Sequence, residues 1–268
     1  MDKIQLEALA QQVAAHPKYQ PITADLVLRL SQEALNLGLT GKPAVKYVRN
    51  KLHQVGSAYF KQKIDYAAAK ALLAQLPQDS NSDDVKNFCR KLMQTHASTA
   101  ERLPILPEFY QTCLASIAPI TSITDLACGL NPLAIPWMPL ADEVHYFACD
   151  IYLDMLDMID AYFRQINLFG QVEPCDLVSN IPTRKTQLAF LLKSIPCLEQ
   201  LDKSIARRLL ENIPSDHILV SFPVHSLGGR QKGMKTFYQD HFNELISGNA
   251  WQVQTFNFAT ELAFLVSK

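Results

Sequence analysis

The stretch "ITDLACGLNPLA", residues 123–134, carries the first chemical signal, because an apolar run stops there at Gly129. Glycine accepts positive φ and lets a ligand approach the backbone closely. A second apolar run ends at Asp150, 21 residues after Gly129. An acid at the end of the second strand can accept hydrogen bonds from both hydroxyls of a ribose. The pair indicates a nucleoside-containing ligand, although the GxGxxG fingerprint of dinucleotide sites is absent.

A third apolar run ends at Cys175-Asp176-Leu177. A strand followed by DxAxG, and then a strand followed by Asp, resembles the pattern of class I S-adenosylmethionine methyltransferases. In those enzymes an acid after the third strand lies near the adenine amino group. Asp150 alone could be a polar residue of a strand-end turn, but the three features in register favour a cofactor site.

Short apolar segments rich in β-formers follow Pro119 and alternate with helical stretches. Strands alternating with helices predict βαβ units and a mainly parallel sheet, and continuous apolar strands indicate burial on both faces. The expected strands are residues 122–127, 143–150, 171–175, 187–193, 217–222 and 261–267. The expected helices between them are residues 154–168, 198–212 and 234–247.

The first hundred or so residues show a helical period and no strand pattern, which predicts a helical bundle. One helix begins near Thr23, another covers residues 44–58, a third covers residues 65–76, and a fourth has Ser82 as its N-cap. The first of these has its apolar stripe at Leu26, Val27, Leu30, Ala34 and Leu37. We therefore expect a helical domain over residues 1–104 and an α/β domain over residues 105–268.

The composition is that of a globular protein, with 48% hydrophobic and 19% charged residues. No apolar run approaches the roughly 20 residues of a membrane span, and the N-terminus lacks a signal-peptide core, so we expect a cytoplasmic protein. The six cysteines form no CxxC pair and no His/Cys cluster, which predicts reduced, buried thiols and no metal site.

The net charge of −1 hides an asymmetry, because no acid lies between Glu33 and Asp65. A basic window of this kind could neutralise several phosphates of a nucleic acid, or it could be a solvated helix face. The window contains His53 and the RNA-binding candidates Lys42, Lys46, Arg49, Lys51, Lys61 and Lys63.

Five blocks, two of which contain the Gly129 and Asp150 features above, make the chain similar to a known family, the 16S ribosomal RNA (guanine-N7) methyltransferases that confer aminoglycoside resistance (the Arm/Rmt/Sgm type). The blocks are "THASTAERL", "DLACGLNPLA", "CDI", "LLKSIPCLE" and "SFPVHSLGGRQKGM", and a weaker one is "KYVRNKLHQVGSAYF". They occur in order over nearly the whole chain. The blocks "THASTAERL" and "SFPVHSLGGRQKGM" are not general methyltransferase features, so they carry the subfamily assignment.

The resemblance implies a class I, Rossmann-like methyltransferase domain preceded by an all-helical domain that grips the 30S subunit. It implies that Arg102 pairs with the methionine carboxylate of S-adenosylmethionine, and that Lys193 and Arg230 act at the target base. The full set of cofactor residues it implies is Tyr59, Phe60, His96, Ala97, Ser98, Arg102, Ala127, Gly129, Asp150, Asp176, Leu177 and Leu192. The departures from the family pattern are Ser194, Cys197 and Leu201.

The chemistry fits a nucleophile with a free lone pair, such as guanine N7, because no base need remove a proton before attack. An exocyclic amine would call for an Asn/Asp-Pro-Pro-aromatic loop, and the chain has Lys-Ser-Ile-Pro from Lys193. A carbon target would call for an activated cysteine, for which Cys197 is the candidate; the alternative is that Cys197 packs in an apolar helix. Arg230 and Lys232 lie in the glycine-rich loop "SLGGRQKG", which suits RNA contact or a mobile basic surface.

The sequence interpretation is thus an enzyme that methylates N7 of a guanine in the decoding A site of 16S rRNA within the 30S subunit. The resemblance implies resistance to 4,6-disubstituted deoxystreptamine aminoglycosides. No metal, membrane or obligate protein partner is expected. Two alternatives stay open: a methyltransferase that acts on another RNA or a small molecule, and a non-catalytic RNA-binding protein that keeps the fold.

Overall fold

The computed structural model describes residues 3–56, 64–224 and 233–268. Within these residues the strands are β1 (Ile120–Leu126), β2 (Leu140–Asp150), β3 (Phe169–Pro174), β4 (Thr186–Leu192), β5 (Ser215–Pro223), β6 (Gln252–Asn257) and β7 (Glu261–Ser267). They form a seven-stranded sheet in the order β3-β2-β1-β4-β5-β7-β6. The first five strands run parallel, and β7 is antiparallel to both β5 and β6. The expected mainly parallel α/β fold is confirmed.

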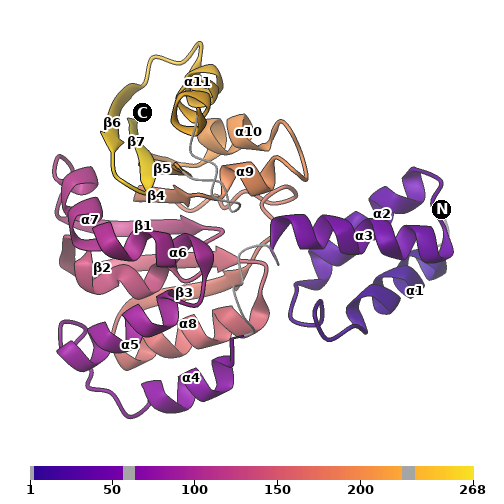
Figure 1. Ribbon diagram of the computed structural model, residues 1–268, viewed down its shortest axis with the longest axis horizontal. Helices are drawn as coiled ribbons and strands as arrows, with labels where there is room; N and C mark the ends of the chain where they lie inside the picture. Colours follow the sequence, from indigo (N-terminus) through magenta and orange to yellow (C-terminus); the bar gives the residue numbers. More distant parts are fainter. Residues whose placement is uncertain (1–2, 57–63, 225–232) are drawn as a thin grey trace.

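Helices cover both faces of the sheet (Figure 1). α8 (Leu153–Gln165) packs along β2 and β3, and α7 (Leu106–Leu114) contacts β7 and the 3-10 segment η3 (Asn131–Trp137). The other face carries α10 (Ile205–Asn212) and α11 (Met234–Ile246). Alternate residues of β4 enter separate cores, with Leu188 and Phe190 on the α8 side and Ala189 and Leu191 on the α10 side. Burial on both faces explains why the strands are continuously apolar.

Three N-terminal helices form a lobe beside the sheet: α1 (Lys3–Ala14), α2 (Ala24–Asn36) and α3 (Gly41–Val55). Most of the expected stripe of α2 is buried, including Leu26, Leu30 and Ala34. Leu37 was wrongly assigned to that stripe, because α2 ends at Asn36 and the Leu37 side chain is 61% exposed.

The next helices lie on the sheet-bearing part of the chain. α4 (Tyr66–Leu73) packs along α8, and α5 (Asp83–Met93) packs against η3. Ser82 is the N-cap of α5, as expected, and its Oγ accepts from Val85 N at 3.4 Å. α6 (Ala97–Arg102) and η2 (Leu103–Ile105) then lead into α7. By packing, the lobe proper is α1–α3; the domain division at residue 104 stays a prediction.

The lobe is joined to the sheet by backbone hydrogen bonds just after β2. Thr23 N donates to Ile151 O at 2.9 Å, and Leu153 N donates to Pro21 O at 2.8 Å. The same junction is closed at Gly56, where an added Cβ would lie 2.1 Å from the Tyr152 hydroxyl oxygen. The start of α2 and the end of α3 are therefore fixed to the loop that follows Asp150.

Two expectations about the second half were wrong or incomplete. The helix expected over residues 198–212 is two helices, α9 (Ile195–Leu198) and α10, separated by a turn in which Asp202 Oδ1 accepts from Ser204 N at 2.8 Å. The sequence also gave no sign of β6. That edge strand is mostly exposed, so it lacks the apolar run by which its neighbours are recognised.

Candidate cofactor and target site

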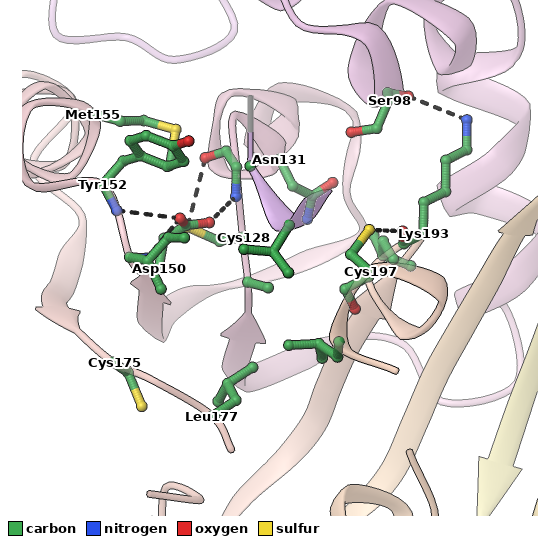
Figure 2. A pocket seen from close by; sticks show the side chains of 18 of the residues that line it. Ser98, Cys128, Asn131, Asp150, Tyr152, Met155, Cys175, Leu177, Lys193 and Cys197 are labelled. Carbon is green, nitrogen blue, oxygen red and sulfur yellow. Dashed lines mark hydrogen bonds between the residues drawn. The ribbon is translucent and has the colours of Figure 1, made fainter. Parts of the chain in front are cut away.

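A pocket lies at the carboxyl ends of β1, β2 and β4, where the strand order changes direction between β1 and β4. The space inside and directly in front of the pocket, open solvent included, is about 890 Å³. Figure 2 shows Asp150 and Tyr152 on one side of it and Lys193 with Cys197 on the other. Most of the expected cofactor residues line it: His96, Ser98, Arg102, Ala127, Gly129, Asp150, Asp176, Leu177 and Leu192.

The loop after β1 explains the lone glycine. Ala127 and Gly129 both have positive φ, at 49° and 52°. An added Cβ on Gly129 would approach the His96 ring to 3.4 Å, so a side chain there would be both strained and crowded. The turn aims Gly129 N at the end of β2, where it donates to Asp150 Oδ2 at 2.9 Å.

Asp150 is buried and held by backbone donors. Besides Gly129 N on Oδ2, its Oδ1 accepts from Ile151 N at 2.7 Å and from Tyr152 N at 3.4 Å. Burial raises the pKa of Asp150, and these backbone N–H groups oppose that rise. Three donors leave acceptor capacity on the carboxylate, which has about four lone-pair positions.

The loop around α6 contributes His96 and Ser98, whose ring Nδ1 and Oγ lie 3.2 Å apart. Burial, and then the nearby Lys193 ammonium, lower the pKa of His96 to about 4, so the ring is neutral at physiological pH. Ala97 is buried but does not line the pocket. Its expected part in the cofactor loop stays a prediction.

Lys193 follows β4 with a left-handed φ of 57° and is 4% exposed. Its ammonium donates to Ser98 O at 3.2 Å and to Glu101 Oε2 at 3.0 Å, and it lies 3.3 Å from Glu261 Oε2. The ammonium thus ties the β4 end to α6 and β7. The neighbouring Cys197 is buried, and its Sγ donates to Lys193 O at 3.7 Å.

Arg102 lines the pocket and is buried. Its Nη2 lies 2.6 Å from Glu261 Oε1, and its Nη1 donates to Asn131 Oδ1 at 2.9 Å. Burial would lower the pKa of Arg102, but Glu261 outweighs it, and the arginine stays charged. Asn131 in turn donates to Asp125 at 2.9 Å, and burial raises the pKa of Asp125 to about 7.

Sequence reasoning missed Glu261 and Asn131. Glu261 is fully buried, and burial raises its pKa while Arg102 and Lys193 bring it down to a net lowering. The available signal was an acid at the first position of the apolar segment ELAFLVS, where a solvated end residue was the simpler interpretation. Asn131 stands in the sequence stretch quoted first, at the first position of η3, and it lines the pocket.

The basic window is only partly a free surface. Lys42 and Lys46 are exposed on α3. Arg49 Nη2 donates to Gln12 O at 3.4 Å, and Lys51 Nζ donates to Gln200 O at 2.9 Å. Other candidates lie outside the described residues: Tyr59, Phe60, Lys61, Lys63, Arg230 and Lys232.

Other features of the described ranges bear on metals, thiols and membranes. All six cysteines are free and buried. In residues 3–56, 64–224 and 233–268 no group of three His, Cys, Asp or Glu side chains could hold a metal ion. Across the same residues, every helix is too short or too polar to span a bilayer.

The sequence is similar throughout its length to curated proteins. One from Micromonospora echinospora, named 16S rRNA (guanine(1405)-N(7))-methyltransferase, is 31% identical over 265 residues, which are 98% of this chain and 97% of that protein. One of the same name from Serratia marcescens is 31% identical over 256 residues, 96% of each chain.

The fold is also similar to solved structures. The crystal structure of the 16S rRNA methyltransferase RmtF in complex with S-adenosyl-L-homocysteine matches with a TM-score of 0.85 and 28% identity, covering 100% of this chain and 99% of that one. The model of the family described as "Ribosomal RNA methyltransferase (FmrO)" matches residues 15–265. A match over nearly the whole chain places it in that family, so the protein belongs to the FmrO ribosomal RNA methyltransferases.

Proposed function

We propose that the protein transfers a methyl group from S-adenosylmethionine to N7 of guanine 1405 of 16S rRNA in the 30S subunit. The name of the curated relatives supports the target atom, because they match over almost the whole length of both chains. The main structural support is the pocket itself, in which the Gly129 backbone and the Asp150 carboxylate meet at the strand-order change.

The residues present fit this cofactor. Asp150 keeps acceptor capacity for ribose hydroxyls, and apolar side chains suited to a purine line the same pocket as Asp176. These apolar residues are Leu26, Val55, Leu177 and Leu201. Arg102 would hold the cofactor's carboxylate, sharing its guanidinium with Glu261 and Asn131. S-adenosylmethionine would supply the methyl group from its sulfonium, and the product S-adenosylhomocysteine would leave as a neutral thioether that needs no protonation.

The target site needs little acid–base chemistry from the chain. Guanine N7 has a free lone pair, so positioning can supply most of the rate. Lys193 would act beside the target base by fixing the wall of the pocket, because its ammonium donates to Ser98 O and Glu101. Cys197 is buried and donates to a carbonyl, which favours packing over nucleophilic attack.

The substrate grip in this proposal comes from two regions. Lys42 and Lys46 on α3 would contact phosphates of the 30S subunit. Arg230 and Lys232, outside the described residues, would act near the target base. Methylation of the decoding site would give resistance to 4,6-disubstituted deoxystreptamine aminoglycosides, and the reaction would take place in the cytoplasm, where 30S subunits are found.

Mapping of 7-methylguanosine tests the proposal. Purified protein and S-adenosylmethionine are incubated with 30S subunits or with free 16S rRNA. The RNA is then treated with borohydride and aniline, and reverse transcription locates the cleavage. We expect a stop at guanine 1405 with 30S subunits and little with free RNA. A stop at another nucleotide, or only on free RNA, would contradict the proposed substrate. Cofactor binding without any methyl transfer would support a non-catalytic RNA-binding protein.

A further inference from the structure

Asp176, after β3, is held by an arginine from the helical lobe. Arg29 of α2 donates through Nε to Asp176 Oδ2 at 2.5 Å and through Nη2 to Oδ1 at 3.2 Å. The Asp176 side chain is 4% exposed and that of Arg29 is 23% exposed. Two parallel N–H···O bonds from one guanidinium fix both the position and the plane of a carboxylate. Arg29 does not itself line the pocket, whereas Asp176 does.

Two local donors also bond to the Asp176 carboxylate. Val178 N donates to Asp176 Oδ1 at 3.2 Å, and Ser179 Oγ donates to Oδ2 at 3.1 Å. With Arg29 these fill about four lone-pair positions. The Ser179 hydroxyl can rotate about its C–O bond and the two bonds from Arg29 are rigid, so Ser179 is the donor that can give way to a ligand.

The lobe is also part of the pocket wall at this end. Leu26 lies on α2 three residues before Arg29, on the same helix face, and it lines the pocket. The bond from Thr23 N to Ile151 O fixes the start of the same helix against the loop after Asp150. Arg29 therefore reaches Asp176 from a helix whose start is fixed to the loop after Asp150.

We propose that Arg29 is a positioning residue that makes this end of the pocket selective for a 6-aminopurine, and this rests on the cofactor use proposed above. An ionised carboxylate accepts hydrogen bonds and donates none. Held in place by Arg29, Asp176 accepts a hydrogen bond from the amino group of adenine, whereas it repels the 6-oxo group of hypoxanthine. Without the two bonds from Arg29 the carboxylate keeps only its Val178 and Ser179 donors and can rotate about its Cβ–Cγ bond, so the discrimination falls.

The test compares two ligands that differ only at that position. Calorimetry on the full chain measures Kd for S-adenosyl-L-homocysteine and for S-inosyl-L-homocysteine. The variants are Arg29→Ala, Arg29→Lys and a matched control, Lys70→Ala. Lys70 is also a cation that links two elements, through Asp157 Oδ2 at 2.6 Å, but neither residue lines the pocket.

We expect wild type and Lys70→Ala to prefer the adenosyl ligand by at least about tenfold. Arg29→Ala should bring that ratio close to one, and Arg29→Lys should fall between, because an ammonium cannot make the paired contact. A purely structural role would weaken both ligands equally and leave the ratio unchanged, which would overturn the proposal.

Two further results separate the possible failures. If wild type binds neither ligand, the cofactor assignment of the proposed function fails. If Arg29→Ala does not fold, Arg29→Gln gives the same ratio test with a neutral side chain of similar reach.

Asp176→Asn should shift the preference toward the inosyl ligand, since an amide can donate to the 6-oxo group. Adding Arg29→Ala to this variant should then change the ratio no further. A further change in the double variant would contradict the proposed route.

Discussion

Arg102, which lines the pocket, forms an ion pair with Glu261, with Arg102 Nη2 2.6 Å from Glu261 Oε1 and side chains 1% and 0% exposed. They are 159 residues apart in the chain, and Lys193 lies 3.3 Å from the same carboxylate. Removing one partner of a buried pair leaves an uncompensated charge, while replacing both can be nearly neutral.

Arg102→Ala should therefore lower the free energy of unfolding by about 3–5 kcal/mol, and Arg102→Met with Glu261→Leu should recover part of that loss. Urea denaturation followed by circular dichroism measures both. Arg164→Ala, which removes an exposed arginine from its contacts with Asp160 in the same helix, is the control and should change stability by less than about 0.5 kcal/mol. A single variant as stable as wild type would show that Glu261 does not depend on Arg102.

Asp150→Ala should weaken binding of S-adenosyl-L-homocysteine by about tenfold to a hundredfold. The physical reason is the loss of charge-assisted hydrogen bonds, each of which contributes on the order of 1.5–3 kcal/mol. Calorimetry gives the change in Kd. Asp142→Ala, at an exposed position earlier in β2, is the matched control and should bind as wild type. Equal affinity of the two variants would remove Asp150 from the ribose site.

Cys197→Ser should keep most of the methyl-transfer rate. The Cys197 thiol is buried and donates to Lys193 O, an interaction that a serine hydroxyl can also make. The measurement is single-turnover methyl transfer to 30S subunits, and binding of S-adenosyl-L-homocysteine tests whether the variant is folded. Loss of transfer with normal binding would instead support a cysteine nucleophile.

Lys42→Glu with Lys46→Glu should weaken 30S binding and flatten its salt dependence. Both side chains are exposed on α3, whereas Arg49 and Lys51 already donate to Gln12 O and Gln200 O. Each lost phosphate contact lowers the slope of log K against log salt by roughly 0.7–0.9. Filter binding at several salt concentrations tests this. Lys235→Glu, at an exposed position of α11, is the control and should leave the slope unchanged. An unchanged slope in the double variant would place the RNA interface elsewhere.

His96 should make the protein less stable as the pH falls. Burial and Lys193 lower its pKa to about 4, against about 6.5 in the unfolded chain, so the unfolded state takes up the proton first. From about pH 7.5 to about pH 5 this costs about 2 kcal/mol. Asp125 acts in the opposite sense, because its raised pKa of about 7 adds stability as the pH falls below that value.

The difference between His96→Gln and wild type therefore isolates the histidine. Urea unfolding at the two pH values should show a smaller acid loss in His96→Gln than in wild type. Parallel pH profiles would mean that His96 is not buried as a neutral ring.

The pocket could be predicted where a local rule applies. Gly129 and Asp150 stand at the ends of neighbouring parallel strands, and parallel strands bring such ends together whatever the rest of the chain does. Glu261 and Arg29 could not be found in this way. Their partners are 159 and 147 residues distant, and nothing in the segments around them distinguishes a buried acid or cation from a solvated one.

Helix boundaries could likewise be predicted only where a local pattern marks them. Ser82 was found because an N-cap is a local pattern, whereas the break between α9 and α10 depends on one turn at Asp202 inside an apolar-periodic stretch. The packing of α4 along α8 is a tertiary choice, and amphipathic period alone does not say which partner a helix meets.

The backbone bonds from Thr23 to Ile151 and from Leu153 to Pro21 bear on how such proteins can be recombined. A chimera that takes residues 1–56 from one relative and the sheet from another could form these backbone bonds whatever its side chains, but it would need glycine at residue 56, opposite the Tyr152 ring. The residues that must match when the lobe is exchanged are therefore Gly56 and Tyr152, and natural variation at one of these positions should track variation at the other.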